Sequence, residues 1–272
     1  MYIKEIIEPQ IAREKRHLFM YGYSNNKREQ LLKDIEKKYP FKFNENISSV
    51  VYIDEIGLPN IEQKAENLDS VKIKRIAISF LEFNIIQNIV NKINQADNKN
   101  VDGLSNLIYE FNSISNINYE NLDEISSSLK KSKDFYSKFY KDYLQTGNDE
   151  YARNAFSNLD ITFIPDLSMF IRDIQDATNN NSAFNVVLDK KEKIPLVSTM
   201  AINSIINMRC NRELAIKVAC APDEWETYTD LNNSYIDYIH DYGILELDNS
   251  YTEYLKSEEE KRKSKNNYIE QK

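Results

Sequence analysis

Four short apolar runs constrain the fold of this chain most strongly. They are HLFMYG (17–22), SSVVYIDEIG (48–57), SAFNVVLD (182–189) and ELAIKVACA (213–221). Mostly apolar runs of this length are typical of strands in a parallel sheet that is covered on both faces. In the last run Leu214, Ile216 and Val218 point one way, with Lys217 and small residues between them. We therefore predict a buried strand at each of the four positions.

Helical segments separate these strands at both ends of the chain. KREQLLKDIEKKY follows the first run and ends before Pro40, where a helix has to stop. LVSTMAINSIINMRC (196–210) lies between the last two runs and is rich in apolar residues. A strand–helix–strand order that recurs in this way predicts an α/β fold with a parallel central sheet.

Helical periodicity also fills the middle of the chain. The segments that carry it are 71–97, 104–114, 122–147, EYARNAFSNL (150–159) and PDLSMFIRDIQDAT (165–178). Gly147 predicts the end of the third segment, and Pro165 is expected in the first turn of the last. We divide the chain into the first half of an α/β core (1–70), a large helical insertion (71–180), the second half of the core (181–250) and a charged C-terminal tail (251–272).

Composition excludes several classes of protein. The net charge of −8 gives no general attraction to DNA or to anionic lipid. Cys210 and Cys220 are the only cysteines, and with two histidines they form no zinc motif and no disulfide framework. No run approaches the length of a membrane span, and the N-terminus has no signal-peptide pattern. We expect a cytoplasmic protein without a membrane anchor or a metal site.

The segment after the first predicted strand stands where a phosphate-binding loop would lie. Gly22 occupies the place of the first glycine, and Asn26 the place of the second. Lys27 or Arg28 replaces the lysine, depending on a gap of one residue, and no Ser or Thr follows to hold Mg²⁺. The alternative interpretation is an ordinary strand, turn and helix with solvated charges.

The third run has the shape of a Walker B strand, because an acid follows the apolar residues. Asp189 would hold Mg²⁺ through water, but Lys190 stands where the catalytic glutamate belongs, and Glu192 comes two positions late. A turn residue at the strand end is the other interpretation of Asp189. Asp54 and Glu55 also follow an apolar run, but their place after the first helix favours a structural strand.

Together these stretches resemble the AAA+ and STAND group of P-loop ATPases, and most closely the bacterial origin-recognition-like ATPases found beside mobile elements and defence genes. The resemblance covers 17–57 and 182–248. Its most specific part is YTDLNNSYIDYIHDYGILELD, which is similar to the "HDY…LD" segment of that group. The resemblance implies a P-loop type of sheet. From it we expect HLFMYG and NVVLD to be adjacent parallel strands, with VVYI and LAIKVA on the outer sides.

Three further groups of residues are candidates for contacts with other molecules. Arg209 and Arg212 are candidates for an arginine that acts on a neighbouring ATPase, or they answer a helix dipole. Core packing best explains the aromatic cluster of Trp225, Tyr228, Tyr235, Tyr238 and Tyr242, and a partner-binding surface is the alternative. For a subunit that binds a partner, we expect this region, Trp225 included, to hold exposed aromatic side chains. Lysines and aromatic residues alternate along Lys130–Tyr143, which favours a core stripe beside a solvated face, with binding of single-stranded nucleic acid as the alternative.

The departures from the nucleotide-binding motifs argue against ATP hydrolysis more strongly than against the P-loop type of fold. We therefore predict that GYSNNKRE does not support ATP hydrolysis, although ATP and Mg²⁺ could still bind. The favoured function is a pseudo-ATPase subunit that binds a protein partner, an ATPase or an effector, in a bacterial defence or mobile-element complex. The alternatives are an active AAA+ ATPase and an accessory protein that binds nucleic acid.

Overall fold

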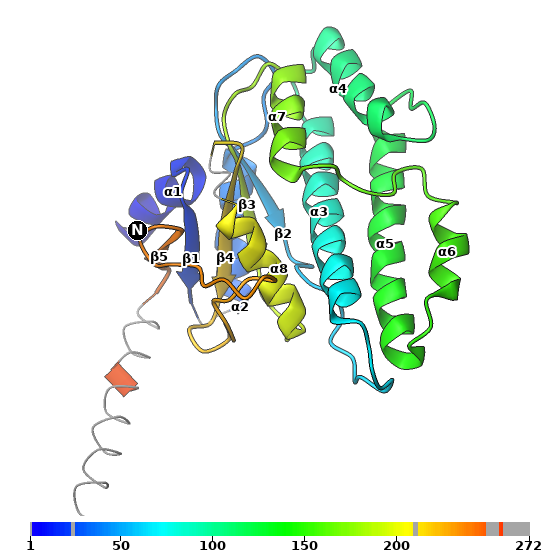
Figure 1. Cartoon of the computed structure of the whole chain (residues 1–272). Helices are drawn as coiled ribbons and strands as arrows, with labels where there is room; N and C mark the ends of the chain where they lie inside the picture. Colours follow the sequence, from blue (N-terminus) through cyan, green and yellow to red (C-terminus); the bar gives the residue numbers. More distant parts are fainter. Residues whose placement is uncertain (1, 23–24, 209–211, 249–255, 258–272) are drawn as a thin grey trace, which may run out of the picture.

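A five-stranded sheet forms the centre of the protein (Figure 1). The computed structural model describes residues 2–22, 25–208, 212–248 and 256–257. The strand order is β2-β3-β4-β1-β5, and every neighbouring pair is parallel. The predicted α/β class with a parallel central sheet is therefore confirmed.

Each of the four predicted apolar runs forms a strand. The strands are β1 (His17–Tyr21), β2 (Ser49–Ile53), β3 (Phe184–Asp189), β4 (Leu214–Cys220) and β5 (Tyr242–Glu246). The sequence did not predict β5 as a strand. It is an edge strand in which only Tyr242 and Gly243 are buried, so its sequence lacks the continuous apolar run that marks the others.

The predicted contact between β1 and β3 is wrong, because β4 lies between them. Phe19 of β1 pairs with Val218, and on the other side of β4 Lys217 pairs with Val187 of β3. β2 does occupy one edge of the sheet, but β5 occupies the other. All residues of β4 are buried, as expected for a strand covered on both faces, which suits it to the centre. The carboxyl ends of β1 and β3 still lie at the same edge of the sheet.

Two layers of helices cover the sheet. On one face, α1 (Tyr2–Arg13) and α2 (Asn25–Lys38) pack against Leu18, Met20 and Val187. On the other face, α3 (Ser70–Asn94) and α8 (Leu196–Asn207) belong to the hydrophobic cluster of Phe19 and Ile216. The connection from β1 to β2 runs in one direction across the sheet, and the connections from β2 through β3 to β4 run back in the other direction. Because such connections are right-handed, helices of opposite direction lie on opposite faces.

Four further helices lie between α3 and β3 in the chain. They are α4 (Val101–Ile114), α5 (Leu122–Thr146), α6 (Glu150–Phe156) and α7 (Leu167–Ala177). α5 packs along α3 and forms a further layer (Figure 1). Gly147 ends α5 in the left-handed conformation, at φ 67°, as predicted. Pro165 is not in the first turn of α7, because Asp166 is the N-cap and its side chain accepts a hydrogen bond from the backbone N–H of Met169.

One hydrophobic cluster joins the sheet to these helices. It extends from Phe19 in β1 through Phe83 in α3 to Phe139 in α5. The helical middle therefore shares its core with the sheet, and the division of the chain at residues 70 and 180 stays a prediction.

Buried polar side chains of the sheet bind the C-terminal end of α1. The sequence did not predict this helix, which contains Pro9. Asn185 donates a hydrogen bond to the carbonyl of Ala12 (2.9 Å). The Lys217 ammonium donates to the carbonyls of Glu14 (2.7 Å) and Arg16. Removal from water lowers the pKa of Lys217 to about 7.

Candidate functional site

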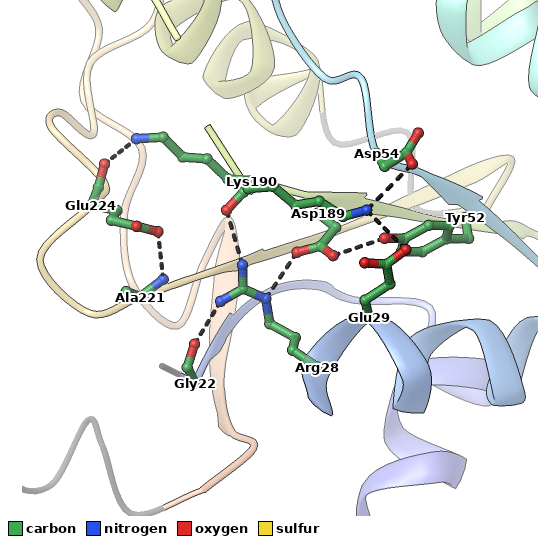
Figure 2. Close-up of polar contacts among 10 residues, drawn as sticks. Gly22, Arg28, Glu29, Tyr52, Asp54, Asp189, Lys190, Ala221 and Glu224 are labelled. Atoms are coloured by element: carbon green, nitrogen blue, oxygen red, sulfur yellow. Dashed lines mark hydrogen bonds and ion pairs between the residues drawn. The ribbon is translucent and has the colours of Figure 1, made fainter. Parts of the chain in front are cut away.

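The carboxyl edge of the sheet brings together Gly22, Arg28 and Asp189, three of the predicted nucleotide-binding residues (Figure 2). β1 leads through Gly22 toward α2, whereas the chain leaves the adjacent β4 in the other direction. Gly22 stays close to β4, since its backbone N–H donates to the carbonyl of Cys220 (3.1 Å). In open α/β sheets, ligands bind where neighbouring strands diverge in this way.

The Arg28 guanidinium fills this position. Its Nε donates to Asp189 Oδ1 (2.8 Å), its Nη1 to the Gly22 carbonyl (2.6 Å) and its Nη2 to the Lys190 carbonyl (2.9 Å). Only 3% of Arg28 and 0% of Asp189 is exposed to solvent. All three guanidinium nitrogens are therefore engaged by groups of the same chain.

Asp189 has a second partner in Tyr52 of β2. The Tyr52 hydroxyl donates to Asp189 Oδ2 (2.8 Å), so each carboxylate oxygen accepts a hydrogen bond. Burial raises the pKa of Tyr52, and the hydrogen bond to Asp189 raises it further. Tyr52 therefore remains a donor. The sequence alone does not point to Tyr52, because it lies inside an apolar run and only the pairing of β2 with β3 brings it near Asp189.

A second, outer network lies beside this pair. The Lys191 ammonium is 3.1 Å from a carboxylate oxygen of Glu29 and 3.3 Å from one of Asp54. It also lies over the Tyr52 ring, 5.7 Å from the ring centre. Hydrogen bonds from Lys33 and then Lys191 lower the pKa of the Glu29 carboxyl. The Lys191 charge is thus compensated by carboxylates of the same chain.

Lys190 turns away from Asp189. Its ammonium donates to the carbonyl of Glu224 (Figure 2). It also lies 5.8 Å from the centre of the Trp225 ring. Glu224 in turn accepts a hydrogen bond from the backbone N–H of Ala221 (2.9 Å). Glu192 is exposed and lines a neighbouring hollow of about 190 Å³ with Asp54. Among the described residues, the position next to Asp189 where a catalytic glutamate would stand is therefore occupied by Lys190, and neither Glu192 nor Glu224 replaces that carboxylate.

The other predicted nucleotide-binding residues do not join the network. Asn26 and Lys27 lie at the start of α2 with exposed side chains. Lys27 makes no ion pair within the part of the chain that the structure describes. Of the two candidates for the phosphate-binding lysine, Arg28 therefore points into the protein and Lys27 points out.

Of the two predicted trans-acting arginines, Arg212 is described by the structure and does not lie near this edge. Arg209 lies outside the described residues. Arg212 is exposed and precedes β4, so it lies at the amino end of that strand, whereas Asp189 lies at the carboxyl end of β3. Arg212 cannot act on the site of its own chain, and action on a neighbouring chain stays a prediction.

The prediction that Trp225 is exposed is wrong. Only 7% of Trp225 and 5% of Tyr242 is exposed, and both rings pack edge-on against Phe19 of β1 (5.0 and 4.8 Å between ring centres). Tyr228 packs against Phe19 as well, and its hydroxyl shares a hydrogen bond with that of Tyr21 (2.7 Å). The large Phe19 ring requires an apolar cover on this face of the sheet, and these residues provide it.

Two of the predicted aromatic residues are exposed at the rim of this cluster. Tyr235 is 67% and Tyr238 49% exposed, and their rings lean on Tyr228 and Tyr242. Ile239 beside them is 64% exposed and has a positive φ of 82°. This conformation is unfavourable for a β-branched residue. The segment therefore presents exposed apolar side chains on a strained turn that is backed by packed rings.

The aromatic residues of the Lys130–Tyr143 segment lie in the core. Those that are buried are Phe135, Tyr136, Phe139, Tyr140 and Tyr143. Lys133 is buried and paired with Glu55 (2.9 Å). Stacking on nucleic-acid bases needs exposed rings, so the proposed stacking by this helix is wrong. These rings form the core stripe of α5, which confirms the interpretation that the sequence favours.

Comparisons with known proteins identify no relative. No protein-family model matches the chain, and searches of curated proteins and of solved structures find no match. Within the described residues, no group of three or more His, Cys, Asp or Glu side chains is placed to hold a metal ion. None of the helices in that part of the chain is long and apolar enough to cross a membrane.

Proposed function

We propose that this chain is a non-hydrolysing protein of the P-loop ATPase type that acts by binding another protein. The observation that carries the first part is the buried Arg28 guanidinium between Gly22 and Asp189. A working loop directs backbone N–H groups and a lysine at the phosphates. Here a nucleotide phosphate would first have to separate a buried ion pair, which leaves an uncompensated charge and is costly.

Magnesium binding meets the same obstacle. The ion needs the Asp189 carboxylate, which already accepts hydrogen bonds from Arg28 and Tyr52. Mg²⁺ would have to displace the Arg28 cation or share the carboxylate with it. Since Lys190 stands beside Asp189, no acid is positioned there to activate water. These features favour a site that lost turnover and kept its fold.

The exposed turn at Tyr235, Tyr238 and Ile239 supports the second part of the proposal. Aromatic side chains are enriched at protein interfaces, and large exposed apolar groups that lie together mark such surfaces. The packed rings behind these side chains hold them in place before binding, which reduces the entropy lost on association. We propose that an ATPase or effector of a bacterial defence or mobile-element complex binds here, as the sequence resemblance suggests.

Steady-state release of phosphate from Mg-ATP tests the loss of turnover. We expect the purified chain to release no more phosphate than the variant Lys27→Ala/Asp189→Ala, both alone and with its partner. Lys27→Ala alone is measured beside it, because Lys27 is exposed and its removal leaves the Arg28 pair intact. Turnover of roughly one per second that Lys27→Ala abolishes would contradict the proposal.

Binding to the proteins encoded beside its gene tests the partner surface. We expect Tyr238→Ser to weaken one such complex by about 2 kcal/mol if Tyr238 is a central contact. Tyr109→Ser on α4 is the matched control, since Tyr109 is 70% exposed and lies on a different element. An equal loss from both variants, measured by surface plasmon resonance, would argue against a surface at Tyr238.

A further inference from the structure

A pocket of about 330 Å³ lies between α3, α5 and α6 and shares no lining residue with the Arg28 network. Its walls include Ile76 of α3, Tyr136 and Phe139 of α5, and Phe156 of α6. The Phe156 ring centre is 5.8 Å from that of Tyr136 and 6.4 Å from that of Phe139, so these rings support one another. The wall is therefore apolar and is held by packing.

The size of the pocket limits its ligand. A cavity of about 150 Å³ accommodates benzene, and this pocket is about 330 Å³. It has room for two fused rings or a short acyl chain. Small-molecule sites in proteins are of this size or larger and are lined mainly by apolar and aromatic side chains, with a few polar groups that orient the ligand.

Among the residues that the structure describes, three charged side chains line the pocket, and one of them has no ion-pair partner there. Lys72 and Asp149 form an ion pair, and the Lys72 ammonium lies 5.0 Å from the centre of the Tyr143 ring. The hydrogen bond from Lys72 to Asp149 raises the pKa of Lys72, which keeps the lysine charged. Arg75 is one turn further along α3, is exposed, and makes no ion pair with any residue that the structure describes.

We propose that this pocket binds a small amphipathic anion. The apolar body of the ligand lies against Tyr136, Phe139 and Phe156, and its carboxylate or similar acidic group pairs with the Arg75 guanidinium. Burial of the apolar body away from water supplies the binding energy. The guanidinium favours an anion over a neutral or cationic ligand, because its planar fork can donate two hydrogen bonds to one carboxylate.

Calorimetric titration of the full chain with sodium decanoate tests this proposal, with decanol as the uncharged counterpart. We expect saturable binding of decanoate and binding of decanol that is about tenfold weaker. Arg75→Gln should weaken decanoate binding by the same factor. Lys74→Gln is the matched control, since it removes one charge from the neighbouring position of α3 without changing the pocket lining, and should leave the affinity unchanged.

A second variant tests whether the ligand enters the pocket. Ala152 lines it and is 4% exposed, so Ala152→Phe should fill the space and abolish decanoate binding. If that variant does not fold, Ile78→Trp on the facing helix replaces it, because Ile78 is only partly buried. Decanoate binding that persists in both Arg75→Gln and the filled variant would overturn the proposal, as would the absence of saturable binding. Neither outcome bears on ATP turnover or on the surface at Tyr238.

Discussion

Arg28 and Lys217 are two of the buried cations of this protein, and their surroundings differ. Arg28 lies at the carboxyl edge of the sheet against the carboxylate of Asp189, and 3% of it is exposed. Lys217 lies within β4 with 0% exposed, and its hydrogen bonds go to the main-chain carbonyls of Glu14 and Arg16. One cation therefore has a full counter-charge, and the other has only dipoles.

This difference in counter-charge determines whether each buried cation can lose its proton. A carboxylate compensates the Arg28 charge, and the guanidinium does not lose its proton in a protein. Two carbonyls do not repay the cost of removing the Lys217 ammonium from water, so burial lowers the pKa of Lys217 to about 7. The proposed nucleotide site is thus closed by a permanent ion pair, whereas the clamp on α1 depends on pH.

Removal of Arg28 should have the largest effect. Arg28→Met leaves the Asp189 charge buried with Tyr52 as its main donor, and we expect a loss of about 3–5 kcal/mol in the free energy of unfolding. Urea denaturation measures this loss. The double variant Arg28→Met/Asp189→Leu should recover most of it, because a pair of apolar residues replaces the pair of charges. A double variant as unstable as the single one would show that packing, and not charge, holds this edge.

The sequence predicted the strands better than their order. The four apolar runs are strands because burial on both faces of a parallel sheet demands such runs, and the sequence shows them directly. The local sequence pattern does not contain the strand order. That order depends on which strand has the most apolar surface to bury on both faces of the sheet. α1 was missed because Pro9 argues against a helix, although tertiary contacts stabilise one there.

The candidate site was predicted in part for a similar reason. Gly22, Arg28 and Asp189 were named from spacing, and the structure brings all three together. The spacing could not decide between Lys27 and Arg28, because one residue rotates a side chain by about 100° around a helix axis. Tyr52 could not be found, since its approach to Asp189 depends on the pairing of β2 with β3.

Removal of Lys217 should have the second largest effect on stability, and this effect appears as a change in how stability depends on pH. The unfolded lysine keeps its proton up to about pH 10.5, whereas the folded one loses it near pH 7. The unfolded chain therefore binds more protons above pH 7, so this residue makes stability rise with pH, by up to about 1.4 kcal/mol per unit. We expect Lys217→Met to remove that rise between about pH 7 and pH 9, as measured by urea denaturation.

The matched control for this experiment is Lys191→Met. Lys191 is paired with Glu29 and Asp54, and hydrogen bonds to these carboxylates outweigh burial and raise its pKa. Its removal should therefore leave the pH dependence in this range unchanged. If the parent protein and Lys217→Met have the same slope, Lys217 keeps its proton when folded and the two buried cations do not differ as described.

Tyr52→Phe should have the smallest effect and isolates one bond at the closed edge. The change keeps the ring, over which Lys33 and Lys191 lie at 5.6 and 5.7 Å, and removes only the hydroxyl that donates to Asp189. Because Arg28 still compensates the charge, we expect a loss of about 1–2 kcal/mol, typical of a hydrogen bond to a charged group. Urea denaturation at neutral pH checks it. A loss as large as that of Arg28→Met would mean that the Tyr52 hydroxyl, and not the Arg28 guanidinium, makes the burial of Asp189 possible. Asp189 would then resemble Lys217, a buried charge that is stabilised by neutral hydrogen-bonding groups and not by a counter-charge.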